Sequence, residues 1–276
     1  MKYRVIILII TTLAFSNCQK VKIAKKQTDI ERRNLNGKVK TLDFWLVKKG
    51  NKNDTTKYRK GRGMYFKFNE NGYPIESKSY PQNPYFDRIT KSEYKESEIL
   101  VKRKSYSIDG ELRYESTYEY DDNGNLIKSS TKFANKSFEG YSLYTYNSNN
   151  LVIEVKNHNW SDSTYARTTY AYDENLNKIK EVEYEWKNNI KSTELYQYNS
   201  NNIIKTITKL DKIGDTIERY KYEYDKFNNR IRVNSSKEKS ISEFYYEFDS
   251  LNNWIKRTTK LNGKEIEYLT RKIEYY

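Results

Sequence analysis

Aromatic residues recur along this sequence at a nearly constant spacing. Steps of 26 residues lead from Phe68 to Tyr94, Tyr120 and onward to Tyr224, and a last step of 24 reaches Phe248. The residue two positions earlier is also aromatic in seven of the eight units, and the residue that follows is Asp or Asn in seven of eight. A repeat of this length restricts the chain to one small structural unit placed side by side many times.

The unit at 118–130, "YEYDDNGNLIKSS", predicts a β-hairpin. Tyr118 and Tyr120 are two residues apart and therefore share one face of a strand. Asp121 can bond its own backbone to start a turn, Gly124 accepts the positive φ of a tight turn, and Ile127 begins the returning strand. The same structural roles are expected at Tyr144, Tyr146, Tyr170, Tyr172, Asp173, Tyr196, Tyr198, Tyr222, Tyr224, Asp225, Tyr246, Phe248 and Asp249.

Further turn sequences, such as "SIDGEL" at 107–112 and "DKIGDT" at 211–216, close each unit. We therefore predict an all-β fold, an antiparallel β-meander of about eight repeated hairpins, with an opening strand or two in 35–50 and a closing strand at the end. We expect a curved or spiralling sheet with the tyrosines as its thin core. An integral outer-membrane barrel is disfavoured, because strands such as "KSTELYQY" alternate charged and aromatic residues and cannot be apolar on both faces.

The N-terminal residues have a different character from the repeats. Lys2 and Arg4 precede an apolar run at 5–15, which is too short for a membrane-spanning helix and suits a signal peptide at 1–17. "FSNC" follows, with the only cysteine, Cys18, and resembles the lipobox of bacterial lipoproteins. This resemblance implies lipidation at Cys18; ordinary secretion with cleavage near Ser16, and a free buried thiol, are the alternatives.

The basic, polar stretch 18–34 is expected to be a solvated tether, and 35–276 the repeat domain. The resulting location is the bacterial cell envelope, with the lipid in the outer membrane and the domain facing the periplasm. Some lipoproteins carry acidic residues soon after the cysteine as a signal for export to the cell surface. Lys20 and Lys22 occupy that region here, which favours the periplasmic side of the membrane. Surface exposure stays possible.

The phrases "YEYDDNGNL", "YAYDENLNK" and "YEYDKFNNRI" resemble the YD repeat of RHS proteins, over roughly residues 64–270. Together with the signal sequence and the opening "LNGKVK", they are similar to uncharacterised lipoproteins of Bacteroidetes-type bacteria. The resemblance implies a hairpin-built shell. We expect a degenerate short-repeat form without a toxin, and the toxin-delivery role of RHS proteins is not carried over.

Few residues offer catalytic chemistry. His158 is the only histidine and is expected to lie exposed at a hairpin turn, Cys18 has no second cysteine to pair with, and the recurring aspartates are explained by turns. We therefore predict no catalytic residue, no metal site and no cofactor.

The sequence favours a membrane-anchored, non-catalytic envelope lipoprotein that acts as a repeat scaffold or interaction surface. The net charge of +14 and the abundant tyrosines also allow a carbohydrate- or polyanion-binding module, and a small hydrolase is the third reading. The expected partners are the membrane, through the N-terminal lipid, and an envelope glycan or protein. Nucleic acid is not expected, because an exported protein meets little of it.

Overall fold

The computed structural model describes residues 27–49, 58–80, 88–135, 139–159, 161, 163–185 and 188–276, with the backbone alone for 58–62. One short helix and 18 strands make up this part of the chain. They are α1 (Asp29–Arg32), β1 (Val39–Lys49), β2 (Tyr58–Phe68), β3 (Pro74–Tyr80), β4 (Arg88–Lys95), β5 (Ile99–Ser107), β6 (Leu112–Tyr120), β7 (Leu126–Phe133), β8 (Glu139–Tyr146), β9 (Val152–Asn159), β10 (Thr164–Tyr172), β11 (Lys178–Glu185), β12 (Asn189–Tyr198), β13 (Ile204–Leu210), β14 (Thr216–Tyr224), β15 (Arg230–Ser235), β16 (Ser240–Phe248), β17 (Trp254–Leu261) and β18 (Lys264–Tyr275).

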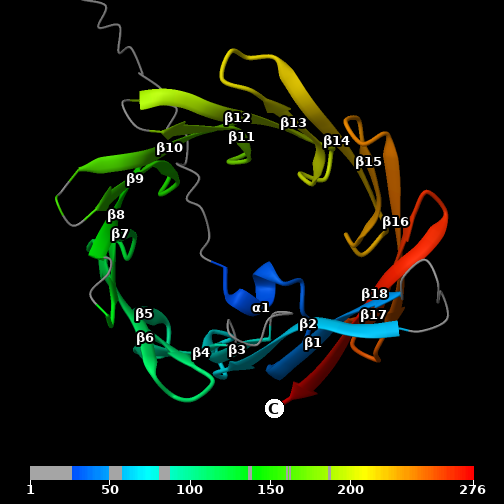
Figure 1. The fold of residues 1–276 in the computed structure, drawn as a ribbon, viewed down its shortest axis with the longest axis horizontal. Helices are drawn as coiled ribbons and strands as arrows, with labels where there is room; N and C mark the ends of the chain where they lie inside the picture. The colour runs from blue at the N-terminus through cyan, green and yellow to red at the C-terminus, as the bar shows by residue number, and fades with distance from the viewer. Residues whose placement is uncertain are drawn as a thin grey trace, which may run out of the picture.

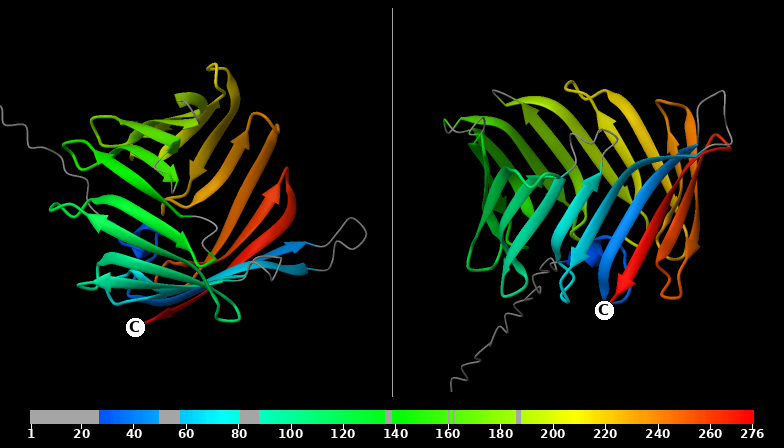
Figure 2. Two further views of the ribbon diagram at one scale, coloured as in Figure 1. Left: turned by 60° about the vertical axis from the view of Figure 1, so that its left-hand side comes forward. Right: turned by 60° about the horizontal axis from the view of Figure 1, so that its bottom comes forward.

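All strands belong to one sheet in which each strand pairs with its neighbours in the chain, as the meander predicts. The sheet closes because β1 pairs antiparallel with both β18 and β2: Leu42 lies opposite Ile273 on one side and Phe66 on the other. The ring is visible in Figure 1 and the tilt of its strands in Figure 2. The all-β antiparallel meander is thus confirmed, but the expected curved or spiralling sheet is wrong, since the sheet is a closed barrel.

The hairpin turns use the predicted residues. The Asp121 carboxylate Oδ1 accepts hydrogen bonds from the backbone N–H of Asn123 at 3.0 Å and of Asn125 at 2.7 Å, and Gly124 has φ 72°. Asparagine takes the glycine's place in other units, with φ between 57° and 63° at Asn150, Asn202, Asn228 and Asn252. Asparagine tolerates this left-handed conformation better than most residues, which explains why Gly and Asn alternate at this position.

A β-bulge accompanies every repeat and contributes to the curvature of the sheet. Tyr120 lies opposite Leu126 and Glu119 opposite Lys128, so Ile127 is an additional residue without a partner. The same irregularity occurs beside all eight aromatic residues of the repeat, namely Phe68, Tyr94, Tyr120, Tyr146, Tyr172, Tyr198, Tyr224 and Phe248. A bulge bends its strand and increases the local twist. Eight bulges at equivalent places bend the sheet repeatedly in one sense, which favours closure.

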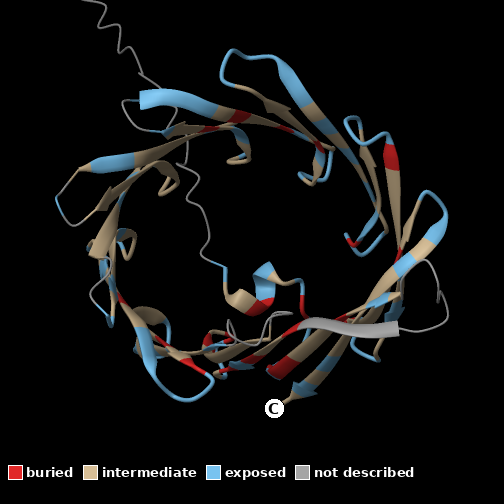
Figure 3. Ribbon diagram, viewed as in Figure 1, coloured by how far each residue is buried: buried red, intermediate tan, exposed pale blue. Residues whose placement is uncertain are grey.

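The largest buried cluster lies where α1 packs inside the barrel against β1 and β2 (Figures 1 and 3). Thr28 and Glu31 form a capping box at the start of α1, in which each side chain accepts a hydrogen bond from the other's backbone N–H. Ile30 and Leu35 join Phe68 in the core, with exposed fractions of 9%, 6% and 0%. The end of the stretch expected to be a solvated tether is therefore folded into the barrel.

Candidate binding site in the barrel lumen

The aromatic face of the sheet lines the inside of the barrel. α1 lies within the ring in Figure 1, and Asp29 and Arg32 of α1 share a cavity with Tyr120 and Tyr146. Because side chains alternate along a strand, Tyr118 must face the same way as Tyr120. The tyrosines expected to be the core of a thin sheet are instead the wall of a lumen.

The outer face carries charged side chains in cross-strand pairs. Glu119 lies opposite Lys128 on the face away from Tyr120, with 3.7 Å between the carboxylate and ammonium. Further outward pairs are Lys102 with Glu115 at 3.6 Å, Lys132 with Glu139 at 2.6 Å and Lys256 with Glu247 at 2.7 Å. A lipid-facing barrel needs an apolar band on this side. Along the described strands these charged pairs interrupt the apolar surface of the outer face. The alternation of charged and aromatic residues in the sequence predicted such a charged face.

One row of tyrosines bonds its hydroxyls to the barrel wall. Each donates a hydrogen bond to the backbone carbonyl 20 residues earlier: Tyr94 to Pro74 at 3.0 Å, Tyr120 to Leu100 at 2.8 Å, Tyr146 to Leu126 at 2.9 Å, Tyr172 to Val152 at 2.7 Å and Tyr198 to Lys178 at 2.8 Å. Burial raises the pKa of Tyr146 and of Tyr172 to about 12, so these hydroxyls remain donors at neutral pH. This row links each repeat to the preceding one.

Replacing Tyr146 by phenylalanine should lower the free energy of unfolding by about 1 kcal/mol, because it removes one partly buried hydrogen bond and keeps the ring. Urea denaturation followed by circular dichroism measures the change. Tyr245→Phe is the matched control, since Tyr245 is 50% exposed on the outer face, and it should change stability by less than about 0.5 kcal/mol. Equal stabilities of the two variants would show that the hydroxyl bond has no structural role.

A second row of tyrosines lies deeper in the lumen; Tyr196 is buried and the others are half-buried. It contains Tyr118, Tyr144, Tyr170, Tyr196, Tyr222 and Tyr246. Cations lie over several of these rings: Arg103 is 5.9 Å from the centroid of Tyr118, Arg230 is 4.6 Å from that of Tyr222, and Lys178 is 4.4 Å from that of Tyr196. Aromatic surface and fixed positive charge therefore alternate around the inside of the barrel.

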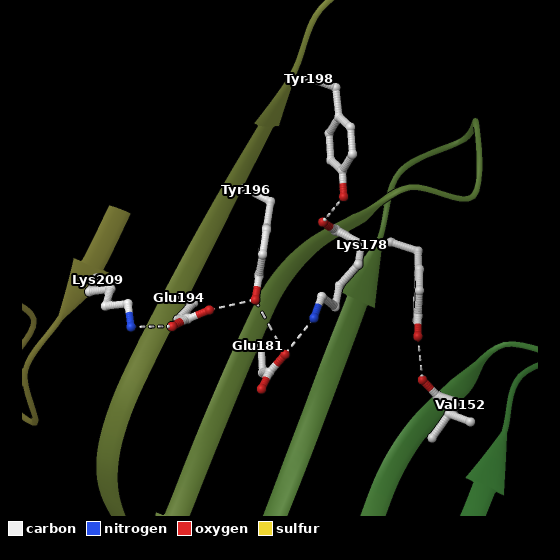
Figure 4. Close-up of polar contacts among 8 residues, drawn as sticks. Val152, Lys178, Glu181, Glu194, Tyr196, Tyr198 and Lys209 are labelled. Carbon is white, nitrogen blue, oxygen red and sulfur yellow. Dashed lines mark hydrogen bonds and ion pairs between the residues drawn. The ribbon is translucent and has the colours of Figure 1, made fainter. Parts of the chain in front are cut away.

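Figure 4 shows a polar network on the part of this wall formed by β11, β12 and β13. The Tyr196 hydroxyl donates to Glu194 at 2.6 Å, and Lys209 pairs with the other oxygen of Glu194 at 3.0 Å. Lys178 pairs with Glu181 at 2.5 Å. Burial and the two carboxylates raise the pKa of Tyr196. Burial also acts to raise the pKa of Glu194, but hydrogen bonds from Tyr196 and Lys209 outweigh it and hold that pKa below its usual value. Charges in this network compensate one another and fix the rings.

Two cavities lie in the lumen between α1 and the wall. The larger, about 550 Å³, is bordered by Tyr94, Tyr120 and Tyr146. The smaller, about 480 Å³, is bordered by Arg33, Phe66 and Tyr118. Asp29 and Arg103 border both, so the two lie next to each other. Cavities with aromatic walls and a few polar groups are the usual setting for ligand binding.

The other candidate residues from the sequence have structural positions. The carboxylates of Asp121, Asp173, Asp225 and Asp249 accept backbone hydrogen bonds within their own turns. His158 lies within β9, not in a turn, and stacks on Tyr141 with 4.7 Å between ring centroids. Cys18 is outside the described residues. Within the described ranges, no group of three or more His, Cys, Asp and Glu residues could hold a metal ion.

Three lumenal arginines were not anticipated from the sequence: Arg33 next to α1, Arg257 on β17 and Arg271 on β18. Arg257 lies opposite Tyr246 and Arg271 opposite Phe44, which places both on the inner face. The only signal in the sequence was spacing. Arg271, for example, lies two residues from Leu269 and from Ile273 and therefore shares their face of the strand.

Comparison with known proteins gives structural neighbours only. No family model and no curated protein matches the chain. Among solved structures, a porin-like protein from Bacteroides uniformis aligns over 86% of this chain and 98% of its own, with 11% identity and a TM-score of 0.49. The Tc holotoxin pore of Photorhabdus luminescens aligns over 75% of this chain with 15% identity and a TM-score of 0.34; the match spans 14% of that chain. Among the described residues, no helix has the length and apolar character needed to span a bilayer.

Proposed function

We propose that this protein is a non-catalytic, lipid-anchored barrel of the bacterial cell envelope that binds a saccharide chain in its lumen. The observation that carries the proposal is the inward orientation of the second tyrosine row. Tyr118, Tyr144 and Tyr170 are only half-buried, so part of each ring remains available inside the barrel. A barrel of 18 strands is too wide for its own side chains to fill.

Tyrosine suits a saccharide partner because its ring can lie against the apolar face of a sugar while its hydroxyl bonds to water or to sugar hydroxyls. The polar groups that accompany the rings, such as Arg103, Lys178 and Glu194, are the kinds of side chain that orient a polar ligand. The charged outer face supports attachment through a lipid rather than through the barrel wall. The resemblance to YD-repeat lipoproteins is part of this proposal.

The test is binding of the purified protein to a panel of envelope polysaccharides, measured as retardation in affinity electrophoresis. Tyr144→Ala combined with Tyr170→Ala should weaken the interaction by about tenfold or more, because each removes a large aromatic contact from the lumen. Tyr245→Ala is the control, since Tyr245 is half exposed on the outer face and should leave binding unchanged.

Two outcomes would overturn the proposal. If no polysaccharide is retarded, or if the Tyr245 variant loses as much binding as the lumenal variant, the lumen is not a saccharide site. If the bound polysaccharide is shortened during incubation, the protein is a hydrolase and the non-catalytic part of the proposal is wrong.

A further inference from the structure

Arg271 on β18 lies in the lumen within electrostatic reach of two other arginines, Arg257 on β17 and Arg33 at the end of α1. Arg271 lies over the ring of Trp254, with 3.4 Å between the guanidinium carbon and the ring centroid. Arg257 lies 5.1 Å from the centroid of Phe244 and 5.8 Å from that of Trp254, and Arg33 lies 4.0 Å from that of Phe66. Stacking on aromatic rings holds the guanidinium planes in place and leaves their edges for other partners.

No carboxylate of the described residues forms an ion pair with these arginines, although the charge of Asp29 acts on Arg33. Among the described residues, no Asp or Glu lies within ion-pair distance of Arg33, Arg257 or Arg271, whereas outward cations such as Lys128 are paired. Several guanidinium nitrogens are buried without a hydrogen-bond acceptor in this part of the chain: Nε of all three residues, and also Nη1 of Arg271. Removing charged donors from water without a partner costs free energy, and it does so more when the charges repel one another.

Arg271 lies close enough to Arg33 and to Arg257 for their charges to act on it. Burial, followed by the positive charges of Arg33 and Arg257, lowers the pKa of Arg271 to about 9. Burial also lowers the pKa of Arg33. Because the arginine guanidinium is charged at neutral pH, the free protein holds a concentrated positive charge that a bound anion would compensate.

We propose that Arg33, Arg257 and Arg271 form a binding site for an oxyanion group, a carboxylate, sulfate or phosphate, carried by the saccharide. The planar fork of a guanidinium matches the paired oxygens of these groups, which favours them over chloride. Arg33 also borders the 480 Å³ cavity next to the second tyrosine row, which gives the anion a route to the site. The statement that a saccharide carries the anion rests on the function proposed above. It narrows the proposed ligand to an acidic polysaccharide.

The first arm of the test uses inorganic sulfate and inorganic phosphate, titrated against the full chain at constant ionic strength with chloride as the balancing ion. Both should raise the melting temperature of the wild-type protein. Arg271→Gln should abolish this shift, and Arg271→Lys, which keeps the charge without the fork, should reduce it. Arg219→Gln is the matched control for charge, because Arg219 is exposed on the outer face, and it should retain the full shift.

The second arm compares oligogalacturonate with its methyl ester, which has the same rings and no charge. The acid should bind about tenfold more tightly than the ester, and Arg271→Gln should remove this difference while leaving the affinity for the ester unchanged. Circular dichroism verifies that each variant is folded, and Arg257→Gln replaces Arg271→Gln if the latter does not fold.

Each outcome separates the two proposals. If sulfate and phosphate protect only the wild type but neither saccharide binds, the anion site stands and the saccharide function fails. If both saccharides bind equally and the ions give no shift beyond chloride, the anion site is wrong while the saccharide function stands. An ion effect of equal size in Arg271→Gln and the wild type would also overturn the assignment of the site.

Discussion

Phe68→Ala is expected to lower the free energy of unfolding by about 3–5 kcal/mol, a large share of the roughly 5–15 kcal/mol that stabilises most domains. Phe68 has no exposed surface and belongs to the cluster that joins α1 to β1 and β2. Its ring lies 6.1 Å from that of Phe66. Removing the ring therefore loses burial and leaves a cavity where the barrel closes.

Equilibrium denaturation in urea measures this loss, with Ile213→Ala as the control. Ile213 lies in a turn and is 75% exposed, so its truncation should cost less than about 0.5 kcal/mol. Because α1 packs on the same cluster, trypsin should cleave Phe68→Ala near Arg32 and Arg33 faster than it cleaves the control. A loss no greater than that of the control would contradict the view that this cluster is the main core.

Cys18→Ser is expected to move the protein from the membrane fraction to the soluble fraction almost completely. Each buried methylene of an acyl chain contributes about 0.8 kcal/mol of membrane affinity, and several chains on one residue would anchor the protein durably. Charged pairs interrupt the outer face, so we expect the barrel wall itself to contribute little membrane affinity. Without the thiol to be acylated, the predicted lipid cannot be attached.

Membrane sedimentation after a high-salt wash measures this effect, because salt removes the residual attraction of the basic residues that follow Cys18. Ser16→Ala is the control, since it keeps a small residue before the cysteine and should leave the protein in the membrane fraction. If the wild-type protein is already soluble, secretion without lipidation is the correct reading. If Cys18→Ser remains with the membrane, the anchor is elsewhere.

Much of the hairpin unit could be predicted from local chemistry. Asp121 and Gly124 define a turn within five residues, and Tyr118 and Tyr120 define a shared face by alternation alone. The bulge was not foreseen: Ile127 lies at the start of the returning strand, as expected, but it is also the additional residue of the bulge and is 39% exposed. Its spacing from the turn was constant, yet spacing alone does not show which residue will lack a partner.

The candidate site was less predictable because it depends on distant contacts. The Thr28 to Glu31 capping box was a readable signal for α1, but only the packing of Ile30 against the barrel places that helix in the lumen. Arg257 and Arg271 are ordinary charged residues in sequence. Their significance arises only when strand pairing sets them beside Trp254 and near Arg33.

The sequence by itself determined the repeating hairpin, because turns, alternation and strand length depend on interactions within about 26 residues. The tertiary structure decided that the sheet closes and that its aromatic face is the inner one. Alternation defines two faces without saying which will be enclosed. Which face is enclosed depends in part on the direction in which the bulges of the eight repeats bend the sheet. Closure also needs the pairing of Val39 with Tyr275, residues at opposite ends of the sheet, which no local pattern specifies.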